Sequence, residues 1–147
     1  MRNLFFGTCF LLFAACGAPD GSPEQALREW VARGETAAEE KDRRGVLQMI
    51  SARYADARGN DHERIGDLLR MYFLRQQSIV LLTNIENIDI TGDSAALVSL
   101  TVGMAGTDGS MLGINADTYR FELELEKSDD EWLLIGARWG EPGSELR

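Results

Sequence analysis

The hydrophobic pattern of this chain changes its period once, near Ser78, and this change is the strongest constraint on the fold. Before Ser78, apolar residues recur every three or four positions, which is typical of helices with one buried face. After Ser78, they alternate with polar residues, which is typical of strands with one buried face. Helices followed by consecutive strands predict an α+β domain, with the helices packed on one face of an antiparallel sheet.

Three helices are predicted before this change. The first begins at Ser22, whose side chain can cap it, and runs to about Lys41. Asp42 can cap a short second helix, and Asn60 with Glu63 can form a capping box at the start of a third. The apolar residues expected on their buried faces are Leu27, Trp30, Val31, Gly34, Ala37, Ala38, Val46, Leu47, Met49, Ile50, Ile65, Leu68, Leu69, Tyr72 and Phe73.

Four strands are predicted after the change. The alternation of the first strand slips near Glu86, which indicates a bulge or bend. Gly92-Asp93 predicts a hairpin turn, and Asp129-Asp130 turns the chain into the last strand, residues 131–139. The residues that mark the first three strands are Val80, Leu82, Ile85, Ile88 and Ile90, then Val98, Leu100, Val102 and Met104, then Tyr119, Phe121, Leu123 and Leu125.

Residues 1–15 are interpreted as an export signal and not as part of the fold. Arg2 is the only charge before Asp20, and residues 4–13 form an almost unbroken apolar run. A positive start, a short apolar segment and small residues at its end are typical of a cleaved signal peptide. The run is shorter than the roughly 20 apolar residues that a membrane-spanning helix needs.

The end of this segment, Phe13-Ala14-Ala15-Cys16-Gly17, resembles the lipobox of bacterial lipoproteins, with Phe13 at a position where Leu is usual. The resemblance implies that cleavage follows Ala15, that Cys16 receives a diacylglycerol through its sulfur, and that the new amino terminus is acylated, for example with palmitate. Gly17, in place of the Asp that retains many such proteins at the inner membrane, implies the outer membrane and a periplasmic domain. The alternative is an ordinary signal peptide, with Cys16 lost or left as a free thiol. Residues 16–21 then serve as a short linker.

The segment 41–54, KDRRGVLQMISARY, is a charged short helix with an apolar core that ends in Ser-x-x-Tyr. It resembles a recurrent opening of the nuclear-transport-factor-2-like superfamily, which includes ketosteroid isomerases and scytalone dehydratases. The order of elements matches this superfamily over residues 22–141, which leaves 142–147 as a C-terminal tail. The resemblance implies a cone-shaped domain, with three N-terminal helices on a curved antiparallel sheet of four main strands, around a mostly apolar pocket. The enzymes of the superfamily place Asp, His, Tyr or Arg residues in this pocket.

Three residues are weak candidates for catalysis. Tyr54 and Asp56 lie on the same side of the chain if it is extended there, and they resemble the isomerase pairing of a base with an oxyanion donor. A solvated Asp56 beside Arg53 and Arg58 is the more common outcome. His62 falls in the first turn of the third helix, where the helix N-terminus disfavours a cation, so an exposed, non-catalytic histidine is expected.

Five residues are candidates for a ligand pocket or its lid. Trp30, Tyr72 and Met104 belong to the apolar faces of the predicted elements, and Met111 and Leu112 lie in the segment 106–117. This segment is long for a hairpin connection, and loops of this length are often functional or mobile. Its apolar tip is expected either to cover the pocket mouth or to pack against the core.

Composition and charge exclude several kinds of function. The chain has 24 Asp and Glu against 15 Lys and Arg, a net charge of −9, which argues against nucleic acid as a partner. It has one His and two Cys, of which Cys9 leaves with the signal peptide and Cys16 carries lipid, so we expect no metal site, no disulfide and no cofactor. Glu122, Glu124 and Glu126 alternate along a strand, which favours a solvated outer face over a calcium site.

These features favour a periplasmic lipoprotein that is anchored to the membrane by its N-terminal lipid. Its pocket would bind a small apolar molecule or an envelope partner without catalysis. A first alternative is a small-molecule lyase, isomerase or hydrolase that uses Asp56 and Tyr54. A second is a homodimeric interaction scaffold, because the strand at 131–139 is apolar on both faces. Members of the superfamily also commonly dimerise through the convex face of the sheet.

Overall fold

Three helices precede four strands in the computed structural model, which describes residues 21–107 and 114–147. The helices are α1 (Pro23–Glu39), α2 (Arg43–Gln48) and α3 (His62–Arg75). The strands are β1 (Ser78–Thr91), β2 (Ala95–Thr107), β3 (Ile114–Ser128) and β4 (Glu131–Gly140). The predicted α+β class and the order of elements are confirmed, whereas the predicted signal peptide, residues 1–15, and the lipidation site at Cys16 lie outside the described residues.

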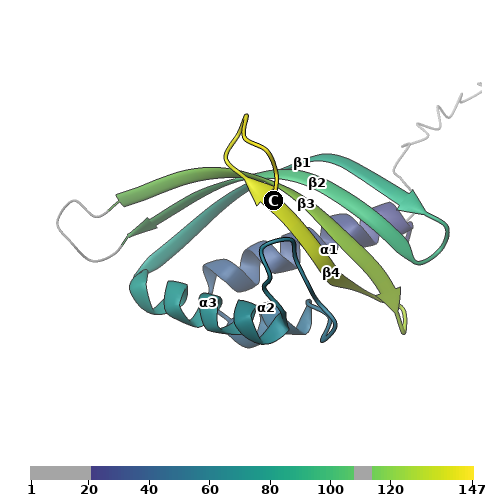
Figure 1. The fold of residues 1–147 in the computed structure, drawn as a ribbon, viewed down its shortest axis with the longest axis horizontal. Coiled ribbons are helices and arrows are strands. Elements are labelled where there is room, and N and C mark those ends of the chain that lie inside the picture. Colours follow the sequence, from purple (N-terminus) through teal and green to yellow (C-terminus); the bar gives the residue numbers. More distant parts are fainter. Residues whose placement is uncertain (1–20, 108–113) are drawn as a thin grey trace, which may run out of the picture.

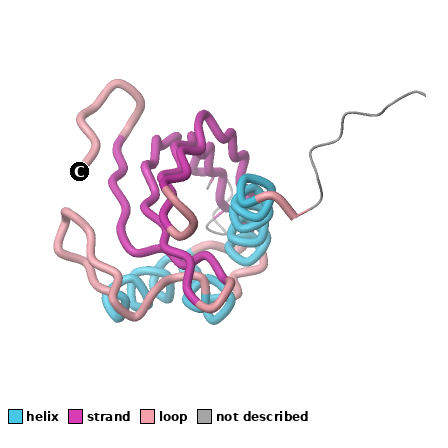
Figure 2. The backbone as a smooth tube through the Cα atoms, turned by 90° about the vertical axis from the view of Figure 1, so that its right-hand side faces the viewer, coloured by secondary structure: helices cyan, strands magenta, loops and turns pink. Residues whose placement is uncertain are grey.

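The four strands form one antiparallel sheet in the order β1-β2-β3-β4, so each strand pairs with its neighbour along the chain. The sheet arches over the helices, which all lie on its concave side (Figure 1). Viewed from the side, the strands curl toward the helices (Figure 2). This arrangement agrees with the prediction of helices packed on one face of a curved sheet.

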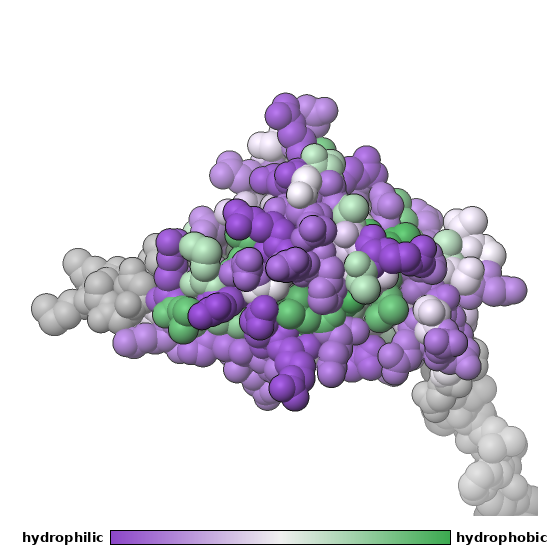
Figure 3. All heavy atoms as spheres, turned by 60° about the horizontal axis from the view of Figure 1, so that its bottom comes forward, coloured by the Kyte–Doolittle hydropathy of each residue, from purple (hydrophilic) through white to green (hydrophobic). Residues whose placement is uncertain are grey.

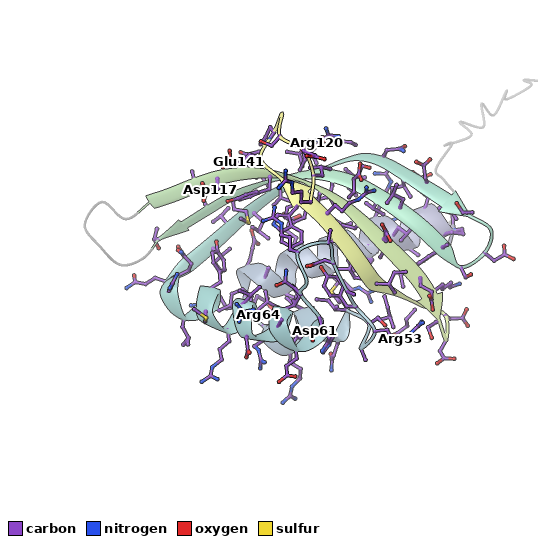
Figure 4. All side chains as sticks on the ribbon, viewed as in Figure 1. Arg53, Asp61, Arg64, Asp117, Arg120 and Glu141 are labelled. Carbon is purple, nitrogen blue, oxygen red and sulfur yellow. The ribbon has the colours of Figure 1, made fainter. Side chains whose placement is uncertain are left out.

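Side-chain caps fix where the helices begin. The hydroxyl of Ser22 accepts a hydrogen bond from the backbone N–H of Gln25 at 3.1 Å, and Asp42 caps α2 in the same way. The predicted cap of α3 is wrong by one residue, because Asp61, and not Asn60, accepts from the backbone N–H of Arg64 at 2.8 Å (Figure 4).

The predicted irregularity near Glu86 is a bulge in β1, where the pairing with β2 shifts between Ile85 and Asn87. Before the bulge, Ile79 is buried, whereas Val80 and Leu82 are 52% and 74% exposed on the convex face. The strand is apolar on both sides at this point, so its pattern marks a strand without indicating which side meets the helices.

The connections between strands agree only in part with the predictions. Thr91 pairs with Ala95, so the connection predicted as the two residues Gly92-Asp93 has three residues, 92–94. Asp129 and Asp130 form a two-residue turn with positive φ angles of 49° and 65°, which Asp tolerates better than most residues. The predicted long connection 106–117 is wrong, because Thr107 still pairs with Ile114 and continuous backbone pairing extends both strands into it. Met111 and Leu112 lie outside the described residues.

The core lies between α1 and the concave face of the sheet. Leu27 of α1, Val98 of β2 and Leu125 of β3 are its most completely buried side chains. Seen from the side of the helices, the molecule is largely hydrophilic, with apolar residues gathered in a band across the middle of this face (Figure 3). Within residues 21–107 and 114–147, no helix combines the length and hydrophobicity needed to cross a membrane.

The free edge of β4 is covered by the segment that follows α2. The backbone N–H of Ser51 donates to the carbonyl of Leu134 at 2.9 Å, and the N–H of Ala55 donates to the carbonyl of Ile135 at 3.2 Å. Covering an edge strand in this way satisfies its backbone groups and blocks pairing with another chain. We call residues 51–61, which begin with this contact and end at the cap of α3, the Asp56 loop.

Candidate functional site

Two apolar cavities lie between the helices and the concave face of the sheet. The first, which we call the α1 cavity, has a volume of about 260 Å³. Its walls come from α1, α2 and the first three strands, and consist of Trp30, Val31, Gly34, Glu35, Val46, Leu81, Thr83, Leu100, Val102, Phe121 and Leu123. Only two of these side chains, Glu35 and Thr83, carry oxygen.

The second cavity, which we call the α3 cavity, has a volume of about 390 Å³ and shares Leu81 with the first. Its walls are Ala38, Ile65, Leu68, Leu69, Tyr72, Phe73, Ile79, Leu81, Met104 and Trp139. Helix α3 therefore faces the ends of β1, β2 and β4 across an apolar space. This volume lies within the usual range for small-molecule pockets.

The sequence of α1 explains why these spaces stay open. Trp30, Gly34 and Ala38 are four residues apart, so they lie on one face of the helix and reach the two cavities in succession. Ala38 has almost no side chain to extend toward the sheet, whereas the missing side chain of Gly34 leaves room for Met49. The helix therefore touches the sheet strongly near Leu27 and leaves space farther along.

The indole N–H of Trp30 is the unusual polar group of the α1 cavity. The side chain is only 6% exposed, and its Nε1 has no hydrogen-bond acceptor among the residues that the structure describes. An unsatisfied buried donor costs about 1–3 kcal/mol of stability, so native proteins contain few of them. The buried Trp30 N–H therefore costs stability at the side of the α1 cavity.

Tyr72 is the polar group in the wall of the α3 cavity. Burial raises the pKa of its hydroxyl, and the nearby Asp117 and Tyr119 raise it further. Asp117 lies on β3, directly opposite Met104 of β2 (Figure 4). At neutral pH the Tyr72 hydroxyl is therefore protonated and able to donate a hydrogen bond.

An aromatic series links the two cavities. The rings of Phe121, in the α1 cavity, and Trp139, in the α3 cavity, stack with centroids 6.3 Å apart. The guanidinium of Arg58 also lies over the Trp139 ring, 4.4 Å from its centroid, and donates to the Trp139 carbonyl at 2.8 Å. Arg58 therefore joins the Asp56 loop to the wall of the α3 cavity.

Tyr54 and Asp56 do come together, as their spacing predicts, but within the Asp56 loop. The Tyr54 hydroxyl donates to Asp56 Oδ2 at 3.1 Å. The same carboxylate accepts from the backbone N–H groups of Arg58 and Asn60 and from the Asn60 side-chain amide, each at 2.9 Å. Asp56 thus organises a turn in the way that Asp commonly does.

The protonation of this pair follows from the same contacts. Burial raises the pKa of Asp56, but the hydrogen bonds from Asn60, Tyr54 and Arg58 outweigh it and hold the pKa below its ordinary value. Burial and the adjacent carboxylate raise the pKa of Tyr54 well above its usual range. Neither residue belongs to the described walls of the α1 cavity or the α3 cavity. This geometry is that of a structural carboxylate.

The other predicted residues divide between the cavities and the loop side of the molecule. Trp30 lies in the wall of the α1 cavity, and Tyr72 and Met104 lie in the wall of the α3 cavity. His62 lies at the start of α3, where its Nε2 is 3.3 Å from the carbonyl oxygen of Leu47. Within the described parts of the chain, no three His, Cys, Asp or Glu side chains are grouped to hold a metal ion.

Several wall residues were not singled out as site candidates by sequence reasoning, notably Leu81, Phe121 and Trp139. Phe121 and Trp139 carry a usable signal, since both lie in alternating apolar strands. Leu81 carries none, because its neighbours Val80 and Leu82 are also apolar.

No family model matches this chain, and no curated protein matches it in sequence. Solved structures do match. A nuclear-transport-factor-2-like superfamily protein from Salmonella enterica serovar Typhimurium has a TM-score of 0.69 at 14% identity, over 82% of this chain and 92% of that chain. The chain has the nuclear-transport-factor-2-like fold.

Two further neighbours carry names that suggest enzymes. A ketosteroid isomerase-like protein from Erwinia carotovora atroseptica has a TM-score of 0.66 at 12% identity, over 82% of this chain and 96% of that chain. A candidate dehydratase of the same fold from Streptomyces avermitilis has a TM-score of 0.69 at 12% identity, over 82% of this chain and 97% of that chain. At these identities the likeness extends to the fold alone, because one fold hosts many functions.

Proposed function

We propose that this chain is a lipid-anchored protein of the bacterial envelope whose domain binds a small, largely apolar molecule without catalysing a reaction on it. The observation that supports binding is the α3 cavity, an apolar space of about 390 Å³ between α3 and the sheet. Mostly apolar cavities with a few polar groups are the common form of small-molecule sites. The Tyr72 hydroxyl supplies one such group.

A cavity-filling substitution tests the binding role. The probe is N-phenyl-1-naphthylamine, a neutral dye that becomes fluorescent in apolar surroundings, added to the full chain in a fluorinated surfactant that dissolves hydrocarbons poorly. We expect Ala38→Phe to weaken dye binding at least tenfold, because the new ring occupies the α3 cavity. Ala32→Phe is the matched control on the exposed side of α1 and should leave binding unchanged. Equal binding by the wild type and Ala38→Phe, or none by either, would refute the proposal.

The lipid anchor is proposed from Phe13-Ala14-Ala15-Cys16-Gly17. Only a cysteine thiolate is nucleophilic enough to take the diacylglycerol near neutral pH. We expect Cys16→Ala to move the protein from the membrane fraction to the soluble periplasmic fraction, and Cys9→Ala to leave it in the membrane. Density-gradient separation of the two membranes then tests the proposed outer-membrane location. A Cys16→Ala variant that stays in the membrane fraction contradicts the anchor.

The non-catalytic role is supported by the state of Asp56. Its carboxylate accepts hydrogen bonds from three residues of its own loop and has a lowered pKa, so it is a poor proton acceptor. The enzyme alternative required Asp56 and Tyr54 to face a pocket together. Steady turnover of a small carbonyl or hydroxy compound that is abolished by Asp56→Asn would restore that alternative.

A homodimer is a second candidate role, favoured by the exposed side chains of Val80 and Leu82 on the convex face of β1. Leu82 pairs with Gly103, which adds no side chain beside it. Exposed apolar patches on a sheet often mark contacts between subunits. Light scattering of the wild type and of Leu82→Lys tests this role, with a dimer for the first and a monomer for the second.

A further inference from the structure

The two apolar cavities meet at Leu81. This side chain belongs to the wall of the α1 cavity and to the wall of the α3 cavity. On the sheet, Thr83 of β1 pairs with Val102 of β2, and both line the α1 cavity. The next pair on the same face, Leu81 with Met104, lies in the wall of the α3 cavity. The concave face of these two strands therefore passes from one cavity to the other without an intervening residue.

The helix and the last two strands show the same continuity. Trp30 of α1 lines the α1 cavity, and Ala38, about two helical turns later, lines the α3 cavity. Phe121 of the α1 cavity stacks on Trp139 of the α3 cavity. From Trp30 to Ala38 the helix rises about 12 Å, which is close to the length of an extended chain of about ten carbon atoms. The two cavities thus follow one another along α1 over a length that suits an elongated molecule.

The side chains around the meeting point keep accessible apolar surface. Leu81, Val102 and Met104 line the cavities on the concave face, yet each remains partly exposed. Val98, on the same face of β2 but outside both walls, is 0% exposed. Removing this apolar surface from water against a hydrocarbon ligand favours binding.

Charge restricts the ligand further. Among the described residues, neither wall contains Lys, Arg or His, and Glu35 lies in the wall of the α1 cavity. The whole chain carries a formal net charge of −9. A carboxylate or phosphate would lose its hydration near a like charge without gaining a cation from these walls. The walls therefore favour an uncharged ligand.

We propose that the two cavities form one binding site for an uncharged molecule with a single unbranched hydrocarbon chain of about ten carbon atoms, which lies along α1 and passes Leu81 to occupy both spaces. This inference rests on the proposed binding function and adds the chemical class of the ligand. A flexible chain fills both cavities, whereas a compact rigid molecule fills only one. Leu81 contacts the middle of the chain and takes part in no reaction.

Two probes with the same ten carbon atoms and one hydroxyl test the proposal: 1-decanol, an extended chain, and 1-adamantanol, a compact cage. The full chain in the fluorinated surfactant is titrated with each probe by calorimetry, for the wild type and for Val102→Phe, whose new ring occupies the α1 cavity. We expect Val102→Phe to weaken 1-decanol at least tenfold and to leave 1-adamantanol, which lies in the larger α3 cavity, unchanged. Each CH₂ group that the ring displaces costs about fourfold in affinity, so the displacement of two is enough.

Asn84→Phe is the matched control. It adds the same ring to the exposed convex face of β1, one residue from Thr83, and should leave both affinities unchanged. Ala38→Phe is the complementary variant. Its ring occupies the α3 cavity and should weaken both probes.

If Val102→Phe proves unstable, the tryptophan ring resonances of the wild type give a second readout. Trp30 and Trp139 belong to the walls of the α1 cavity and the α3 cavity, whereas Trp132 lines a different cleft with Arg33 and Gln48. 1-Decanol should shift the resonances of Trp30 and Trp139, and 1-adamantanol those of Trp139 alone. The Trp132 resonances should shift with neither probe.

The outcomes separate this proposal from the binding function on which it rests. If 1-decanol binds equally to the wild type and to Val102→Phe, or shifts the resonances of Trp139 alone, the proposal of one continuous site is overturned and the binding function of the α3 cavity stands. If 1-decanol, 1-adamantanol and the naphthylamine dye all fail to bind to the wild type, both are overturned. Binding of decanoate as tight as that of 1-decanol would overturn the restriction to uncharged ligands.

Discussion

The Asp56 loop and the wall of the α1 cavity use polar groups in opposite ways. In the loop, one carboxylate accepts four hydrogen bonds, from Tyr54, Arg58 and both nitrogens of Asn60. In the wall of the cavity, the indole N–H of Trp30 is buried and meets no acceptor from the described residues. A group whose hydrogen bonds are all made contributes stability and has little left to offer a ligand. A buried group with an unmet hydrogen bond costs stability.

The largest effect expected from this comparison is the loss of the Asp56 carboxylate. Asp56→Ala should lower the free energy of unfolding by about 2–3 kcal/mol, because it removes the carboxylate that accepts hydrogen bonds from Tyr54, Arg58 and Asn60. Urea denaturation followed by tryptophan fluorescence measures this change. The control is Asp67→Ala, at an exposed position on α3, which should change stability by less than about 0.5 kcal/mol. Equal losses of stability for the two substitutions would contradict a stabilising role for the Asp56 carboxylate.

The next effect is the pH dependence of the stability that the Asp56 carboxylate contributes. Its pKa in the folded protein lies below the ordinary value of 3.8, so folding favours the ionised form. The resulting stability is present above pH 3.8 and is lost as the pH falls through the lower folded pKa, because the unfolded chain binds a proton first. The stability difference between the wild type and Asp56→Asn should therefore shrink between about pH 5 and pH 2.5. A difference that stays constant over this range would contradict the role assigned to these hydrogen bonds.

The smallest of these effects concerns the cavity wall. Met104→Ala should cost only about 1 kcal/mol, less than the 2–5 kcal/mol usual for such truncations in a packed core, because Met104 already faces empty space. Leu125→Ala is the matched core substitution and should cost about 3 kcal/mol, since Leu125 is only 1% exposed. Chemical denaturation of both variants checks this ranking. Equal losses would show that the α3 cavity is packed like the rest of the core.

Sequence reasoning succeeded where the determinants are local. The cap at Asp42 and the bulge at Glu86 depend on a few neighbouring residues, and both are present in the structure. The order of helices and strands follows from the change in the period of the hydrophobic pattern. Few arrangements of elements in this order bury one face of each element. This is why the fold class, and with it the general place of a pocket, were predictable before any coordinates.

Sequence reasoning failed where contacts between segments far apart in the chain determine which residues face a cavity or cap a helix. The side of β1 that faces the helices is not fixed by a strand that is apolar on both faces, and so Leu81 was missed as a wall of both cavities. Asn60 looked like the cap of α3, but its side chain is engaged by Asp56 and the next residue takes that role. No pattern in the sequence reveals that the Trp30 donor lacks an acceptor, since that depends on everything packed around it.

The contact between Arg58 and Trp139 has a kinetic consequence. The Asp56 carboxylate holds Arg58 in place through the Arg58 backbone N–H, and the Arg58 guanidinium lies over the ring of Trp139, a residue in the wall of the α3 cavity. A brief opening of the loop would uncover that ring without separating any pair of strands. The time a molecule spends in the α3 cavity would then depend on hydrogen bonds it never touches, and a slow step in its release would be set by the loop.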